Sequence, residues 1–167
     1  MSQEIAAHTR AKRQPIARVS AHDLPELPHW SPALSVGNAK LDEQHIVLLE
    51  MGRNLLDGLV ELPAALPRIL IELEDLLLAS LEHDAAEEHI LAANGCPTLS
   101  DHRLSHTANR HRLERLLDAA RQGDLDVAAL RQAIQGWMHH HVNEYDLPVK
   151  AYMTPTRGNR RNQELAA

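Results

Sequence analysis

The sequence predicts an all-α protein whose main part is an antiparallel up-down-up-down four-helix bundle. Apolar residues recur at helical spacing in four successive segments, and prolines or glycines separate these segments. Each predicted helix also carries a histidine on the face that its apolar residues define, which is how a four-helix bundle builds a metal site in its core. The chain of 167 residues is long enough to bury one core without disulfides.

The composition argues against several classes of partner. The net charge is −6, the isoelectric point is about 6.0 and the basic residues are scattered, so we expect no nucleic-acid partner. No stretch approaches the roughly 20 apolar residues of a membrane span, and residues 1–14 lack the apolar run of a signal peptide. The single Cys96 cannot form an internal disulfide. We therefore expect a cytoplasmic protein with no membrane partner, present as a monomer or a weak oligomer.

Three regions follow one another along the chain. Residues 1–29 contain several prolines and no sustained apolar period, so we interpret them as a disordered arm. Residues 30–152 are expected to form the bundle, with Trp30 covering one end of its core. Residues 153–167 are expected to be a flexible tail.

The first predicted helix spans about residues 41–62 and places His45 on its apolar stripe. A single histidine on such a stripe is more often a hydrogen-bonded core residue than a metal ligand. The second predicted helix ends near residue 93, and its His83 and Glu87 lie one turn apart on one face. Burying a carboxylate is costly unless it is paired or binds a metal, so a metal site and a surface salt bridge are both open explanations of this pair.

The third predicted helix spans residues 99–121 and carries His102 and His106 one turn apart. Two histidines at this spacing also occur in zinc proteases, where a glutamate follows the first histidine and acts as the general base. Here Arg103 occupies that position. The protease interpretation is therefore excluded.

The fourth predicted helix spans about residues 126–142 and ends in three consecutive histidines. Only His141 continues the apolar stripe, whereas His139 and His140 point elsewhere and are expected to be solvated. Asp146 lies five residues beyond His141, about 140° away on an ideal α-helix. Because a proline follows shortly afterwards, we expect the helix to unwind before Asp146, which would let this carboxylate turn inward.

Each of the four helices thus contributes one motif, and the motifs are Asp42-x2-His45, His83-x3-Glu87-Glu88, His102-x3-His106 and Trp137-x3-His141-x4-Asp146. In this order and at these separations they resemble the hemerythrin family, specifically the bacterial hemerythrin-like domains. The resemblance includes the segment Leu41-Asp42-Glu43-Gln44-His45 and covers about residues 30–152. Each motif is weak by itself, but seven ligand positions on four helices make a specific joint match.

The resemblance implies a non-haem diiron centre, with two iron ions and a bridging oxygen atom, inside the bundle. It also implies how the seven residues divide between the irons: His102, His106 and His141 on one iron, His45 and His83 on the other, and Glu87 and Asp146 bridging both. The iron with two histidines would keep an open position at which O2 binds reversibly. The implied function is therefore that of an O2 carrier, store or scavenger, and not that of an enzyme.

Three other functions remain open on the same scaffold. One is a diiron enzyme that handles peroxide or nitric oxide. Another is an O2 or redox sensor. The third is a module that holds zinc or iron without any gas chemistry. The resemblance does not distinguish these roles, because all of them use the same ligand positions.

The sequence departs from the family pattern around the expected O2 pocket. Asp84 stands where the family commonly has phenylalanine, and Ala79, Leu91 and Cys96 replace an aromatic residue, a methionine and a tyrosine. The chain contains no phenylalanine at all, so we expect leucines, Trp137 and Tyr145 to close the pocket. We interpret Asp84 as a solvated charge on the helix flank; a polar pocket is the alternative and would favour irreversible oxidation of the metals.

Overall fold

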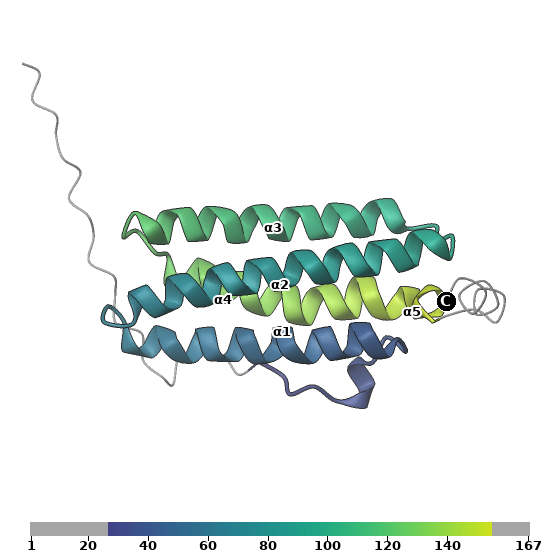
Figure 1. The fold of residues 1–167 in the computed structure, drawn as a ribbon, viewed down its shortest axis with the longest axis horizontal. Coiled ribbons are helices and arrows are strands. Elements are labelled where there is room, and N and C mark those ends of the chain that lie inside the picture. Colours follow the sequence, from purple (N-terminus) through teal and green to yellow (C-terminus); the bar gives the residue numbers. More distant parts are fainter. Residues whose placement is uncertain (1–26, 155–167) are drawn as a thin grey trace, which may run out of the picture.

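The computed structural model describes residues 27–154, and all regular structure within this part of the chain is helical, as predicted. Figure 1 shows the long helical segments side by side. They are α1 (Ala39–Gly58), α2 (Leu66–Ala93), α3 (Leu99–Arg121) and the continuous pair α4 (Val127–Gln135) and η4 (Gly136–Asp146). The short elements are η2 (Pro32–Leu34), η3 (Leu59–Glu61), η5 (Leu147–Val149) and α5 (Lys150–Met153). None of the described helices is both long and apolar enough to cross a membrane.

Two of the helices begin at side chains that accept hydrogen bonds from the first turn. The Asn38 side chain accepts from the backbone amides of Lys40 and Leu41 at the start of α1. Asp126 accepts from the amide of Ala129, 2.9 Å away, at the start of α4. Such caps satisfy amides that have no partner inside the helix, and they fix where each helix starts.

A tight turn connects α2 to α3 and sets the spacing between the histidine motifs of these two helices. Gly95 adopts a φ of 68°, a left-handed conformation that favours glycine. The amide of Cys96 then donates to the carbonyl of Leu91 over 2.9 Å, which closes the end of α2. As a result, α3 returns along α2, and the two helices pack against each other.

The C-terminal part of the fourth helical segment is a π-helix of 11 residues, η4. The expectation that the chain unwinds before Asp146 is wrong, because the backbone stays helical and changes its hydrogen-bond register instead. The amide of Leu147 donates to the carbonyl of Val142, five residues earlier. In a π-helix residues five apart lie one turn apart, so His141 and Asp146 share a face. Their Nε2 and Oδ1 atoms are 3.0 Å apart.

The interior consists of two apolar clusters with a polar layer between them. The larger cluster is built mainly of leucines and contains Trp137 and Ile134. The smaller cluster lies at the α5 end of the bundle: Val36, Leu41, Leu91, Cys96, Val149 and Met153. Along each long helix, buried histidines and carboxylates stand between the residues of the two clusters.

The first described residues lie against the bundle. Leu27 is buried in the larger cluster, and the carbonyl of Pro28 accepts a hydrogen bond from the Arg53 guanidinium at 3.3 Å. Trp30 packs against the same cluster. At the other end Met153 is fully buried. The remainder of the predicted arm, residues 1–26, and of the predicted tail, residues 155–167, lie outside the described residues.

Gly52 on α1 lets the first residues pack closely on the bundle, and this gives a test of the packing. A Cβ atom at Gly52 would lie 3.0 Å from Leu27 and 3.1 Å from Ile134. We expect Gly52→Ala to lower the free energy of unfolding by about 1 kcal/mol net, because overpacking costs about 1–3 kcal/mol while alanine gains at most about 1 kcal/mol in a helix. Urea denaturation measures the change.

Gly136→Ala is the matched control, because the nearest heavy atom to a Cβ there is an Arg112 nitrogen at 4.0 Å. This variant should be no less stable than the unchanged chain. Equal stabilities of the two variants would contradict the close approach at Gly52.

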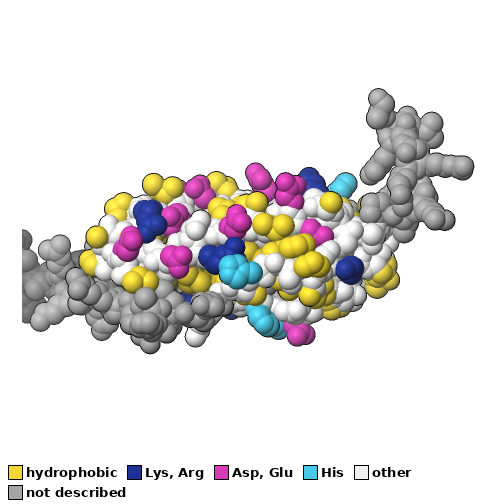
Figure 2. Space-filling view, turned by 90° about the horizontal axis from the view of Figure 1, so that it is seen from below, with side chains coloured by type: hydrophobic (Ala, Val, Ile, Leu, Met, Phe, Trp, Pro, Cys, Tyr) yellow, Lys and Arg dark blue, Asp and Glu magenta, His cyan; other side chains and the backbone are white. Residues whose placement is uncertain are grey.

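Charges of both signs are distributed over the bundle surface. On the face shown in Figure 2, Asp and Glu side chains alternate with Lys and Arg side chains and with apolar side chains. Several ion pairs cross between helices on the surface, such as Arg121 with Glu74 at 2.6 Å. Exposed pairs of this kind contribute little to stability.

Candidate metal centre

Seven predicted ligand residues form the polar layer between the two apolar clusters, and each has at most 3% of its surface exposed. Every long helical segment contributes at least one of them. In chain order they are His45 from α1, His83 and Glu87 from α2, His102 and His106 from α3, and His141 and Asp146 from η4. The helical stripes that predicted these residues therefore face one common region.

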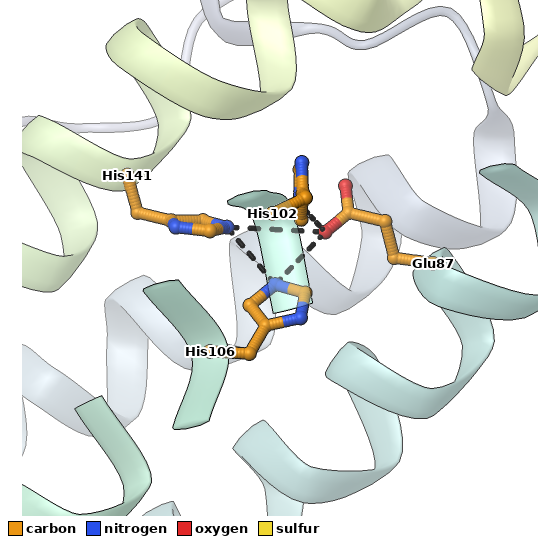
Figure 3. Close-up of side chains that lie close together, drawn as sticks. All are labelled: Glu87, His102, His106 and His141. Atoms are coloured by element: carbon orange, nitrogen blue, oxygen red, sulfur yellow. Dashed lines mark hydrogen bonds and ion pairs between the residues drawn. The ribbon is translucent and has the colours of Figure 1, made fainter. Parts of the chain in front are cut away.

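The first group of possible metal ligands contains Glu87 and three histidines (Figure 3). Glu87 Oε2 is 2.9 Å from His102 Nε2, 3.2 Å from His106 Nε2 and 3.9 Å from His141 Nε2. The Nε2 atoms of His106 and His141 are 3.0 Å apart. One donor atom from each residue thus points to the same small volume, which could hold a metal ion.

The second group contains His45, His83, Asp146 and again Glu87. The Nε2 atoms of His45 and His83 are 3.2 Å apart. His83 Nε2 is 3.8 Å from Glu87 Oε2, and His45 Nε2 is 3.4 Å from Asp146 Oδ2. In each of the two groups all donor atoms lie within 4.8 Å of one another.

The two carboxylates face both groups. Glu87 belongs to both of them. Asp146 directs Oδ2 toward His45, while its Oδ1 lies 3.0 Å from His141 and 3.3 Å from His102. The two possible metal positions are therefore adjacent and share their carboxylates.

The outer nitrogens of three histidines contact polar side chains around the centre. His106 Nδ1 lies 3.0 Å from Glu88, His141 Nδ1 lies 2.9 Å from Ser105, and His83 Nδ1 lies 3.4 Å from Gln44. A carboxylate or other acceptor on the outer nitrogen fixes the ring so that its second nitrogen presents a lone pair to a metal. The sequence analysis named Glu88 and Gln44 only as parts of motifs and did not predict these contacts, because the hydrogen-bond partners of a ligand histidine have no characteristic spacing.

Several buried oxygen and nitrogen atoms of the polar layer lack a donor partner in the protein, and a bound cation would supply one. Glu87 Oε1 and both carboxylate oxygens of Asp146 are buried without a hydrogen-bond partner within the described residues. The paired Nε2 atoms of His106 and His141 present two lone pairs to each other unless a proton or a metal ion lies between them. The residues present therefore fit a metal centre.

The pKa values follow from this crowding of buried groups. Burial by itself would raise the pKa of Glu87, but its histidine contacts hold that pKa well below its usual range. Burial would also lower the pKa of His102 and of His141, but Asp146 and Glu87 outweigh it and raise these values to about 10 and about 9. In the metal-free chain, protons on these two histidines balance the charge of the carboxylates.

No protein-family model, curated protein or solved structure matches this chain. The site is therefore interpreted from its own geometry and donor chemistry. Buried histidine, glutamate and aspartate side chains form two adjacent groups that could hold metal ions.

Two aromatic rings cover His141. The Tyr145 ring stacks on it with centroids 5.2 Å apart, and the Trp137 ring lies nearly parallel to it at 6.4 Å. Trp137 also makes an edge contact with His83 at 6.1 Å. These two ring contacts restrict the movement of the His141 imidazole.

Asp84 differs from the expectation. It is not a solvated charge, because only 6% of its surface is exposed and burial raises its pKa to about 6. Its Oδ1 lies 3.5 Å from His106 Nε2. The sequence analysis failed here because the spacing of α2 gives Asp84 a flank position, and the packing of α3 on that flank is what buries it.

The consecutive histidines of η4 provide a test of the helix phase. His141 is buried, whereas His139 and His140 are exposed. We expect His141→Ala to lower the metal content of the purified chain, because it removes a donor atom, and His139→Ala and His140→Ala to leave it unchanged. Elemental analysis of the three variants measures this. Loss of metal from the His140 variant with retention in the His141 variant would show that His140, and not His141, faces the interior of the bundle.

Proposed function

We propose that this chain is a hemerythrin-like, non-haem diiron protein that binds O2 reversibly, as a carrier, store or scavenger. In this proposal the four helical segments form the antiparallel up-down-up-down bundle of that family. The colours of Figure 1 support this topology, because α1 runs from right to left, α2 returns, and α3 and α4 repeat the alternation. The single free Cys96 agrees with a cytoplasmic location.

The observation that carries the proposal is the sharing of Glu87 by two ligand groups. A mononuclear site needs one group of donors, whereas a carboxylate that faces two groups is suited to bridging two ions. Asp146 supports the same interpretation, since its two oxygens point to histidines of different groups. This arrangement supports the proposal of two metal positions per chain.

The donor set favours iron and O2 binding. Five imidazoles and two carboxylates form a nitrogen-rich set that suits iron, whereas the carboxylate-rich diiron proteins combine Glu-x2-His motifs from two helices with further glutamates. Two bridged irons would supply the electrons that bind O2 and would recover them on its release. The chain's own residues position the donors, supply the negative charge and exclude water from the centre.

A second candidate is an enzyme that turns over peroxide or nitric oxide at the same centre. A surface groove of about 650 Å³ between α3 and η4 is lined in part by His141, Trp137 and Tyr145. The groove would give a substrate or reductant access to a ligand of the centre. The buried Asp84 also makes the surroundings of the centre more polar than an aromatic residue would.

Iron content and absorption spectra distinguish these functions. The purified chain is loaded with ferrous iron without oxygen, exposed to air and then deoxygenated. Two irons per chain, with a near-ultraviolet and visible band that appears in air and disappears on deoxygenation, is the expected result. An irreversible change with steady turnover of peroxide would favour the enzyme. A chain that binds no iron would contradict both functions.

A further inference from the structure

The residues that follow two of the predicted ligands form a contact between α2 and α3. Glu88 follows Glu87 on α2, and Arg103 follows His102 on α3. One oxygen of Glu88, Oε1, lies 3.0 Å from His106 Nδ1. The other oxygen, Oε2, accepts a hydrogen bond from Arg103 Nε at 2.9 Å. A single carboxylate therefore connects a buried imidazole of the candidate centre with a guanidinium at the surface.

The exposed fraction of the side chain increases outward along this contact. It is 2% for His106, 26% for Glu88 and 53% for Arg103. Burial would raise the pKa of Glu88, but its hydrogen bonds with His106 and Arg103 lower this value. The carboxylate of Glu88 is therefore ionised at neutral pH, and its charge lies between the polar layer and solvent.

This charge is placed unequally with respect to the two ligand groups. Among the described residues, Glu88 is the carboxylate that contacts an outer nitrogen of a predicted ligand histidine. That histidine, His106, belongs to the first group. Two other outer nitrogens contact neutral side chains instead, in the pairs His141–Ser105 and His83–Gln44.

A carboxylate acceptor changes how strongly an imidazole binds a metal ion. When Nε2 of His106 binds a metal, Nδ1 carries the ring proton and donates a hydrogen bond to Glu88. The negative charge of the acceptor raises the basicity of the metal-binding nitrogen. Arg103 donates to the same carboxylate and attracts part of its electron density, so it acts in the opposite sense.

We propose that Glu88 is a positioning residue that strengthens metal binding in the first group through His106, and that Arg103 limits this effect from the surface. The inference rests on the metal centre of the proposed function, but it does not depend on O2 binding. It makes the two metal positions unequal, because an anion supports a histidine of the first group, whereas a neutral amide contacts His83 of the second.

Cobalt(II) is the probe for the test. The metal-free full chain is titrated with cobalt(II) chloride without oxygen, against a competing chelator. We expect Glu88→Gln to weaken one cobalt site about tenfold, because the glutamine oxygen accepts the same hydrogen bond without the charge. Arg103→Gln should strengthen that site a few-fold. Weaker binding in both variants would contradict the inference, because it is the result expected if the two residues only stabilise the fold.

The double variant shows whether Arg103 acts through Glu88. The chain with both Glu88→Gln and Arg103→Gln should bind cobalt as Glu88→Gln alone does, because the guanidinium then has no carboxylate to act on. An equal effect of Arg103→Gln with and without Glu88 would contradict this part of the inference and indicate only a general effect of surface charge.

A second pair between the same helices provides matched controls. Glu74 on α2 and Arg121 on α3 form an exposed ion pair at 2.6 Å. Glu74 lies about 20 Å along α2 from Glu88, at about 1.5 Å per residue. Glu74→Gln and Arg121→Gln should therefore leave both cobalt affinities unchanged. Circular dichroism of each metal-free variant checks its helix content.

Proton NMR of the cobalt-loaded chain locates the effect at His106. Cobalt(II) moves the signals of the Nδ1 protons on bound imidazoles far outside their ordinary range. In Glu88→Gln one of these signals should shift and exchange faster with solvent, while the others remain as in Glu74→Gln. A spectrum in which no such signal changes would contradict the contact between Glu88 and a metal-bound His106.

The possible outcomes separate this inference from the proposed function. If Glu88→Gln binds both cobalt ions with the affinities of Glu74→Gln, the inference is contradicted and the seven-donor centre stands. If the unchanged chain binds no cobalt, the centre itself is contradicted and the inference with it. Opposite effects of Glu88→Gln and Arg103→Gln, together with no reversible O2 band in the iron form, would support the inference and contradict O2 binding.

Discussion

Replacing Glu87 by alanine is expected to reduce the metal content of the chain from two ions to fewer than one. Glu87 lies in both ligand groups, so one substitution removes a donor from both positions. It also leaves five histidines facing the remaining Asp146 in a fully buried layer. Since loss even of a residue that only supports a ligand costs roughly 10- to 100-fold in affinity, the loss of a shared ligand should abolish stable binding. Elemental analysis after gel filtration measures the metal content.

Glu82→Ala is the control for this experiment, because Glu82 is an exposed carboxylate on the same helix. It should retain both ions. A Glu87→Ala chain that is folded and keeps its full metal content would show that the two groups do not share this carboxylate, and a dinuclear centre would no longer be supported.

Loading the metal-free chain with metal at neutral pH is expected to release about two protons per chain. The pKa of His102 is raised to about 10 and that of His141 to about 9, in both cases because contacts with Asp146 and Glu87 outweigh burial. Both rings are therefore protonated at pH 7, and both must lose a proton before Nε2 can bind a metal. Proton release into a weakly buffered indicator solution measures the number directly.

The release of these protons also determines how the metal affinity of the chain depends on pH. Between pH 6.5 and about 9 two protons compete with the metal, so the apparent association constant should rise about 100-fold per pH unit. The stability of the metal-free fold changes with pH in the opposite direction. Both histidines have pKa values above the ordinary 6.5 in the folded chain, so the protonated rings stabilise the fold fully below pH 6.5. This stabilisation is lost as the pH rises through about 9 and 10. An affinity independent of pH across this range would contradict the protonated state of the two rings.

The sequence predicted those parts of the site that follow from α-helical periodicity. His45, His83 and His102 lie on regular α-helices, so the positions of their neighbours on the apolar stripe already indicated that they are buried. His141 could also be distinguished from the two exposed histidines beside it, because the apolar stripe of its helix continues through this residue. For these residues the burial predicted from helical periodicity is the burial found in the folded chain.

The alignment of Asp146 and the burial of Asp84 cannot be predicted from a helical period of about 3.6 residues. The π-helix η4 aligns Asp146 with His141 through five-residue spacing, which an α-helical analysis interprets as a break. Asp84 is buried by residues from another helix, so its own segment gives no sign of burial. The backbone hydrogen-bond register decides the position of Asp146, and packing between helices decides the burial of Asp84.

We expect the polar layer to divide the bundle into two parts that open separately. The smaller apolar cluster, which includes Leu41, Leu91 and Met153, is separated from the larger one by buried histidines and carboxylates. Without metal, backbone amides at the α5 end should exchange hydrogen for deuterium through local unfolding, well before the rest of the chain. Metal would join the two parts into one cooperative unit, so that protection of these amides reports whether the centre is filled.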